Sequence, residues 1–137
     1  MPDKTVKLLS VVAPMYNEED NVFPLYERVR ATLEKSVPAF ELILVDNGSW
    51  DKTLEHLKSL SDKDNRVRYV SLSRNYLAQG GILAGLHFSR GDVVVSIDGD
   101  LQQPPELIPD MLAKWREGYD VVFTLKKEHQ YLSAHRR

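Results

Sequence analysis

The 137-residue sequence contains no cysteine and no long apolar run. The absence of cysteine excludes disulfide frameworks, thiolate nucleophiles and cysteine-ligated zinc sites. The apolar runs are only a few residues long, far short of the ~20 residues that a membrane-spanning helix needs. Residues 1–10 also lack the apolar core of a secretory signal peptide. We therefore expect a soluble, cytoplasmic domain.

An excess of charge of one sign is also missing, since 18 Lys and Arg residues stand against 20 Asp and Glu residues. The net charge of −2 provides no basic footprint, so we expect no nucleic-acid partner. Hydrophobic residues make up 42% of the chain, which suits a globular protein with one core. Residues 126–137 are locally basic. We therefore divide the chain into a domain over residues 1–125 and a basic tail over residues 126–137, which is either solvated or faces an anionic surface.

Short apolar runs rich in β-branched residues alternate with amphipathic stretches along the chain. Apolar residues spaced three and four apart predict four helices: one after Asn21, one around residues 54–60, one over 75–89 and one after the proline pair 104–105. The third would present Ile82, Leu83 and Leu86 as its apolar face. The apolar runs predict strands over residues 6–13, 40–45, 67–72, 92–97 and 119–125.

This strict alternation of strand and helix predicts an α/β fold, with a mostly parallel sheet and helices on both faces. Ligands bind such sheets at the carboxyl ends of the strands, near the point where the strand order reverses. Polar segments follow the first, second and fourth predicted strands, at residues 14–20, 46–49 and 98–103. We therefore expect the functional site at this edge of the sheet.

Asp98 and Asp100 are the strongest candidates for metal ligands. If the strand stays extended beyond Ile97, their side chains face the same side, with the small Gly99 between them. Two carboxylates with open coordination positions suit Mg²⁺ or Mn²⁺ shared with substrate phosphates, and Gln102 could supply a third oxygen. An Asp-Gly-Asp segment after a strand is also a common turn, so the pattern alone leaves both interpretations open.

Four segments together resemble the inverting family-two glycosyltransferases, and within them the polyprenyl-phosphate sugar transferases. They are VVAPMYNEEDNVFPLYERV, LILVDNGSWDKTLEHL, SLSRNYLAQGGILAGL and VVVSIDGDLQQPPELIPDMLAKWREGYDVV. The resemblance covers residues 6–124. It implies the nucleotide-binding part of a GT-A fold, truncated before the acceptor half.

The resemblance also implies roles for single residues. Pro14, Tyr16 and Glu18 would line the base and ribose pocket of a UDP- or GDP-linked sugar. Asp46 would hydrogen-bond the base or ribose, and Arg74 would approach the phosphates.

The acidic motif carries the chemistry in this family. Asp98, Asp100 and Gln102 would hold Mn²⁺ or Mg²⁺, and Asp98 would also contact the nucleotide. Asp98 and Asp100 would thereby act in catalysis, because the metal neutralises charge on the departing nucleoside diphosphate. The acceptor would be a polyprenyl phosphate, which places the parent protein at the cytoplasmic face of a membrane.

The sequence departs from the family pattern at a few positions. Asn47 replaces a usual second Asp, and Leu77 and Ala78 replace a Gly and a basic or His residue. Trp50 stands where a small or hydroxyl residue is usual. Three further glycines, at positions 80, 81 and 85, fit no phosphate-binding motif and predict close helix packing.

Two other functions stay open on sequence grounds. The acceptor half is absent, so the chain could be a nucleotide-binding fragment with little or no transferase activity, and a truncated sheet could favour self-association. An Asp-x-Asp after a strand also occurs in phosphotransferases that use the first Asp as nucleophile. Gln102 and the late position of the strand argue against that enzyme class.

Overall fold

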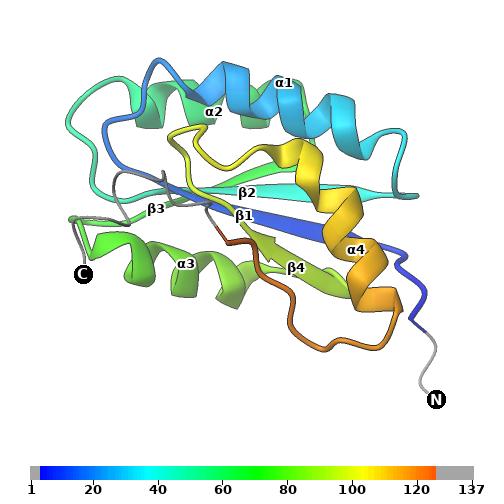
Figure 1. Cartoon of the computed structure of the whole chain (residues 1–137). Helices are drawn as coiled ribbons and strands as arrows, with labels where there is room; N and C mark the ends of the chain where they lie inside the picture. Colours follow the sequence, from blue (N-terminus) through cyan, green and yellow to red (C-terminus); the bar gives the residue numbers. More distant parts are fainter. Residues whose placement is uncertain (1–3, 126–137) are drawn as a thin grey trace, which may run out of the picture.

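Four parallel strands pair side by side in the order β3-β2-β1-β4. They are β1 (Leu9–Met15), β2 (Phe40–Asp46), β3 (Val67–Ser71) and β4 (Val93–Ser96). This computed structural model describes residues 4–125 of the chain. The central strands β1 and β2 are buried along their whole length, because helices cover both faces of the sheet. The predicted parallel α/β fold is therefore confirmed (Figure 1).

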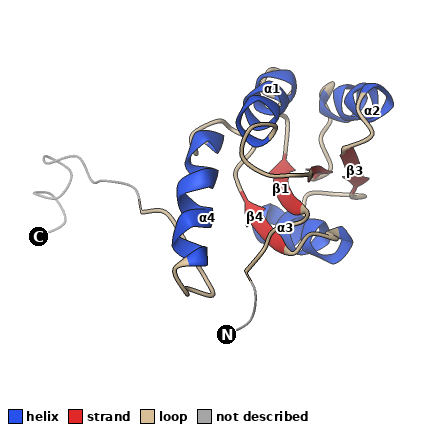
Figure 2. Ribbon diagram, turned by 90° about the vertical axis from the view of Figure 1, so that its right-hand side faces the viewer, coloured by secondary structure: helices blue, strands red, loops and turns tan. Residues whose placement is uncertain are grey.

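The helices divide unequally between the two faces (Figures 1 and 2). One face carries α1 (Val22–Leu33), α2 (Thr53–Lys63) and α4 (Ile108–Arg116), the last preceded by the 3-10 turn η1 (Pro105–Leu107). The other face carries only α3 (Leu77–Phe88). Most of the apolar core consequently lies under α1, α2 and α4, and a much smaller cluster lies between the sheet and α3.

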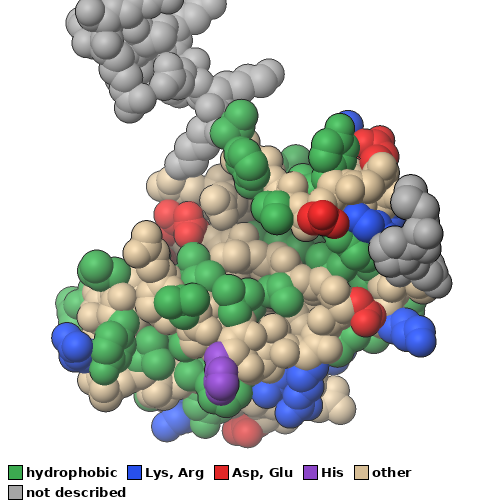
Figure 3. Space-filling model, turned by 90° about the horizontal axis from the view of Figure 1, so that it is seen from below, with side chains coloured by type: hydrophobic (Ala, Val, Ile, Leu, Met, Phe, Trp, Pro, Cys, Tyr) green, Lys and Arg blue, Asp and Glu red, His purple; other side chains and the backbone are tan. Residues whose placement is uncertain are grey.

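The helix α3 packs on the sheet through glycines rather than through large side chains. Gly81 and Gly85 are its buried residues. A Cβ atom built on Gly81 would lie 2.7 Å from the Cβ of Pro14, and one on Gly85 would overlap Val12. The prediction of close glycine packing is confirmed. The predicted apolar face is wrong in part, since Leu83 is 67% exposed and Leu86 is also exposed. Figure 3, which views the molecule from the α3 side, shows apolar side chains on this surface.

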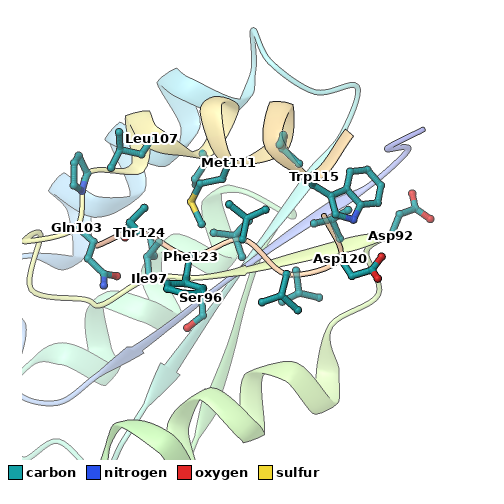
Figure 4. Close-up of a pocket in the computed structure, with 18 residues that line it drawn as sticks. Asp92, Ser96, Ile97, Gln103, Leu107, Met111, Trp115, Asp120, Phe123 and Thr124 are labelled. Carbon is teal, nitrogen blue, oxygen red and sulfur yellow. The ribbon is translucent and has the colours of Figure 1, made fainter. Parts of the chain in front are cut away.

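The predicted fifth strand is wrong within the described residues. Residues 119–125 form no strand, and Val121, Phe123 and Leu125 are exposed. Residues 120–124 instead line a cavity of 540 Å³ whose other walls are β4 and α4 (Figure 4). A strand needs a hydrogen-bonded neighbour, and the cavity separates this segment from the outer edge of β4.

Each helix within residues 4–125 is too short or too polar to cross a lipid bilayer.

Candidate functional site

A hollow of 260 Å³ opens at the carboxyl edge of the sheet. The ends of β1, β2 and β4 and the start of α3 meet there, as expected for a doubly wound sheet. Its lining consists of Pro14, Met15, Tyr16, Glu18, Asn47, Asn75, Leu77, Ala78, Asp98, Gly99 and Asp100. Five of the residues predicted from sequence are among them: Pro14, Tyr16, Glu18, Asp98 and Asp100.

The loops that follow β1 and β2 are joined by hydrogen bonds between side chains and backbone. Asn17 adopts the left-handed conformation (φ 51°), and its N–H donates to the Ser49 hydroxyl over 2.9 Å. The Asn17 side-chain oxygen in turn accepts from the N–H of Trp50, and the Thr53 hydroxyl accepts from the N–H of Glu18. These reciprocal bonds fix the position of Tyr16 and Glu18, which follow the end of β1.

Asp46 is not part of the hollow's lining. It is the last residue of β2, it is 2% exposed, and its carboxylate accepts a 3.1 Å hydrogen bond from the N–H of Ser49. In this structure Asp46 therefore stabilises the turn after β2.

The acidic segment after β4 forms a turn, so the expected extended geometry is wrong. The strand ends at Ser96, the backbone turns at Gly99 and Asp100, and Leu101 has a φ of 64°. Close packing explains the glycine at position 99, because an added Cβ would lie 2.9 Å from the carbonyl oxygen of Pro14. Asp98 and Asp100 nevertheless both line the hollow.

Gln102 and Gln103 stabilise this turn through hydrogen bonds with Asp100 and Asp98. The N–H of Asp98 donates to the side-chain oxygen of Gln103 over 3.0 Å, and the N–H of Gln102 donates to a carboxylate oxygen of Asp100 over 3.0 Å. Gln102 is exposed and is not part of the hollow's lining. Gln103 was not predicted from the sequence to have a role of its own.

An ion pair holds the same loop from outside. Arg28 on α1 donates through Nε and Nη2 to the two carboxylate oxygens of Glu106 in η1, over 2.9 and 2.8 Å. The hydrogen bond from Arg28 lowers the pKa of Glu106. Sequence reasoning missed this pair, because the partners lie 78 residues apart and nothing local connects them.

Arg74 is exposed and stands outside the hollow. Its guanidinium stacks over the ring of Tyr76 at 4.4 Å from the ring centroid.

The described lining of the hollow contains three carboxylates, Glu18, Asp98 and Asp100, and no Lys, Arg or His. Such a hollow suits a cation, or an anionic ligand that arrives with one.

The donor chemistry of the hollow fits a hard divalent cation. Asp98 and Asp100 offer carboxylate oxygens, which Mg²⁺ and Mn²⁺ prefer. Within residues 4–125 no three His, Asp or Glu side chains form a ready ligand cluster. A cation held here would therefore keep positions for phosphate oxygens and water, as Mg²⁺ does in nucleotide sites.

The chain matches known proteins over nearly its whole length. The sequence model of "Glycosyl transferase family 2" matches residues 10–136. An "Uncharacterized glycosyltransferase sll0501" of Synechocystis sp. is 43% identical over 89% of this chain and 38% of its own length. An "Undecaprenyl-phosphate 4-deoxy-4-formamido-L-arabinose transferase" of Pseudomonas aeruginosa is 44% identical over 91% of this chain and 37% of its own length.

Solved structures show the same architecture. The crystal structure of S. aureus TarS 1-349 in complex with UDP-GlcNAc superposes with a TM-score of 0.61 and 25% identity, over 80% of this chain and 31% of that chain. The chain spans less than two-fifths of the length of the two curated relatives, the Synechocystis and Pseudomonas aeruginosa proteins.

Proposed function

Because the chain belongs to glycosyl transferase family 2, we propose that it forms the donor site of a metal-dependent transferase that moves a sugar from a nucleotide sugar to a polyprenyl phosphate. One observation carries this proposal. Asp98 and Asp100 face the same hollow as Tyr16 and Glu18, although about 80 residues separate the two pairs along the chain. In this arrangement a metal-bound diphosphate would lie beside the nucleoside of the same ligand.

Asp98, Asp100 and Gln102 would hold Mn²⁺ or Mg²⁺. When bound, the cation neutralises the negative charge that gathers on the departing nucleoside diphosphate. The cation is needed for a further reason, because a diphosphate that arrived without it would be repelled by the three carboxylates of the lining. In this role Asp98 and Asp100 are the residues on which catalysis depends.

The remaining predicted residues would contact the nucleoside and phosphates. Pro14, Tyr16 and Glu18 form the β1 side of the hollow and would contact base and ribose. Asp46 would hydrogen-bond the base or ribose, and Arg74 would have to leave its stack on Tyr76 to reach the phosphates. The UDP-GlcNAc complex of a relative with the same fold supports a nucleotide-sugar donor.

The acceptor follows from the relatives whose names specify an undecaprenyl-phosphate transferase. A phosphate oxygen of the acceptor would attack the anomeric carbon, and the bond from that carbon to the nucleotide diphosphate would break. A phosphate is already ionised near neutral pH, so this attack needs little help from a general base.

The lipid acceptor would place the whole protein at the cytoplasmic face of a membrane. Residues that orient it would lie in the part of the relatives that this chain does not span, so we expect weak transfer by the 137-residue chain alone.

The test is a thermal-shift titration with UDP, GDP and their sugars, with and without Mn²⁺. A ligand that binds only the folded state raises stability by about 2.7 kcal/mol at a hundredfold excess over its dissociation constant. We expect one nucleotide to stabilise the chain only when Mn²⁺ is present. Asp100→Asn should abolish the Mn²⁺-dependent part, whereas Asp110→Asn, an exposed position on α4, should retain it.

The outcomes separate the candidate functions. Mn²⁺-dependent binding with sugar transfer supports the transferase, and binding without transfer supports a non-catalytic nucleotide-binding module. A folded chain that no nucleotide stabilises would contradict the donor site. A trapped phosphate on Asp98 would instead support a phosphotransferase.

A further inference from the structure

A buried amide joins the end of β2 to the start of α3. Asn47 follows β2 directly and is 3% exposed. Its side-chain oxygen accepts a hydrogen bond from the N–H of Tyr76 over 2.9 Å, and its Nδ2 donates to the carbonyl oxygen of Leu77 over 2.7 Å. Both polar atoms of one side chain are therefore used on two consecutive residues that lie 29 and 30 positions away.

The backbone that Asn47 holds is in an unfavourable conformation. Leu77 has a φ of 65°, a backbone region that a bulky residue rarely adopts and that is unfavourable for it. Its side chain is 72% exposed, so burial does not compensate for this cost. Hydrogen bonds compensate for it instead. The side-chain oxygen of Asn75 accepts from the N–H of Leu77 over 2.7 Å, and Nδ2 of Asn47 donates to the carbonyl oxygen of Leu77. The amide of Asn47 thus ties this segment to the end of β2 by two hydrogen bonds.

The segment in question is one wall of the candidate donor hollow, since Asn75, Leu77 and Ala78 all line it. We propose that Asn47 is a positioning residue for the donor nucleotide: it fixes the wall formed by residues 75–78 and so sets the shape of the nucleotide pocket. This inference rests on the proposed function. It assigns to Asn47 an action through the backbone of α3 rather than a contact with the reacting atoms.

Only a side chain with both a donor and an acceptor can make this pair of bonds. A carboxylate would place an oxygen against the carbonyl oxygen of Leu77, and it would add negative charge beside Asp46 and the three acidic residues of the lining. Asn47 and Leu77 are two of the positions at which the sequence departs from the pattern of its family.

The first test compares nucleotide binding by three variants near pH 7.5, using UDP and GDP with Mn²⁺ as probes. Asn47→Ala removes both hydrogen bonds without adding charge, and Asn47→Asp keeps the shape but replaces the donor. Asn65→Asp adds the same charge on an exposed turn before β3 and is the control. We expect both changes at Asn47 to weaken nucleotide binding about tenfold or more, equal to 1.4 kcal/mol. Asn65→Asp should match the wild type, and the affinity for Mn²⁺ alone should not fall in any variant.

A pH profile then separates positioning from a merely structural role. Near pH 5.5 a carboxyl group at position 47, which would face the carbonyl oxygen of Leu77 and share the lining with Glu18, Asp98 and Asp100, would take up a proton and regain a donor toward that carbonyl. Relative to the control, Asn47→Asp should therefore recover nucleotide binding at low pH, and Asn47→Ala should not. If only Asn47→Asp is weak and Asn47→Ala binds normally, charge is responsible and the proposal is wrong. Normal binding by both variants would also overturn it.

Amide hydrogen exchange tests the same contact without a ligand. In the wild-type chain the N–H of Tyr76 should exchange slowly, because it is bonded to the Asn47 side chain. Asn47→Ala should accelerate this exchange and leave the amides of β1 protected, whereas fast exchange at Tyr76 in the wild type would overturn the proposal. If the wild type binds no nucleotide, the proposed function fails and the role of Asn47 in nucleotide positioning fails with it. Slow exchange at Tyr76 would then identify the contact as structural only.

Discussion

At the scale of single residues, the absence of a side chain determines how α3 packs on the sheet. Gly85 is buried against Val12, whose side chain belongs to the small cluster on that face. Only a residue without Cβ allows this approach, since an added carbon would overlap the Val12 methyl group. The packing of α3 in turn determines the position of Leu77 and Ala78, which line the hollow.

We predict that Gly85→Ala destabilises the fold by about 1–3 kcal/mol, the usual cost of overpacking a core. Val12 lies on a central strand and cannot move away, so α3 must shift instead. Chemical denaturation measures the change, and Ala84→Gly on the same helix is a comparison that removes a methyl group without creating an overlap. A Gly85→Ala variant as stable as the wild type would show that the helix adapts freely.

The candidate site also shows what sequence can supply at this scale. Asp98 and Asp100 were correctly expected at the carboxyl edge, because that follows from strand order alone. Their expected extended geometry was wrong, since the segment turns at Gly99 and Asp100, and the Pro14 carbonyl, 85 residues away in the chain, leaves no room for a side chain at Gly99. Asn47 could be seen only as an unusual residue, since its partners on α3 become neighbours through folding.

At the scale of elements, the order and type of the first four strands and the four helices could be predicted from periodicity, and boundaries shifted by a few residues. Periodicity could not show whether residues 119–125 form a fifth strand. Residues 119–125 have the composition of a strand, but composition gives no information on whether a hydrogen-bonded neighbour is present. The cavity beside β4 shows that this neighbour is missing within the described residues.

Ion pairs between elements were equally invisible in the sequence. Asp64, at the end of α2, accepts hydrogen bonds from the guanidinium of Arg66 and from the hydroxyl of Tyr26 on α1. The Arg66 hydrogen bond holds the pKa of Asp64 well below its ordinary value. Since the pKa in the unfolded chain is about 3.9, this contact stabilises the fold above about pH 4 and is lost as the pH falls further.

We predict that Asp64→Asn lowers the stability near neutral pH by roughly 1–2 kcal/mol, allowing for the partial exposure of Arg66. The same variant should lose less stability than the wild type when the pH falls below about 4, because it has no carboxylate to protonate at this position. Thermal unfolding of both proteins across this pH range measures the effect. Parallel curves would mean that Asp64 contributes nothing to the acid sensitivity.

The Arg28–Glu106 pair gives a contrasting prediction for the loop that carries Asp98 and Asp100. Both side chains are substantially exposed, so we expect Glu106→Gln to change stability by less than about 1 kcal/mol. Its effect should fall on Mn²⁺-dependent nucleotide binding, because the pair holds η1 next to the acidic turn. Titration of Mn²⁺ and nucleotide measures it, with Glu117→Gln on an exposed ion pair at the end of α4 as the control. Equal affinities in both variants would show that the Arg28–Glu106 pair does not position the acidic turn.

At the scale of the whole molecule, the sheet has an unpaired outer edge at β4 within the described residues, next to exposed apolar side chains. Val121, Phe123 and Leu125 are 77%, 73% and 82% exposed. Free strand edges beside apolar surface are typical sites of association between chains. The donor hollow opens at the ends of the strands rather than along this edge, so association here need not block nucleotide binding.

We therefore predict that the 137-residue chain associates with itself in a concentration-dependent manner through the β4 side. Phe123→Asp should shift the chain toward the monomer in light-scattering experiments, because it places a charge at the centre of the exposed apolar segment. Leu83→Asp, an equally exposed apolar position on the outer face of α3, should leave the association unchanged. If Leu83→Asp dissociates the chain and Phe123→Asp does not, the contact lies on the α3 face, and the β4 edge is stable without a partner.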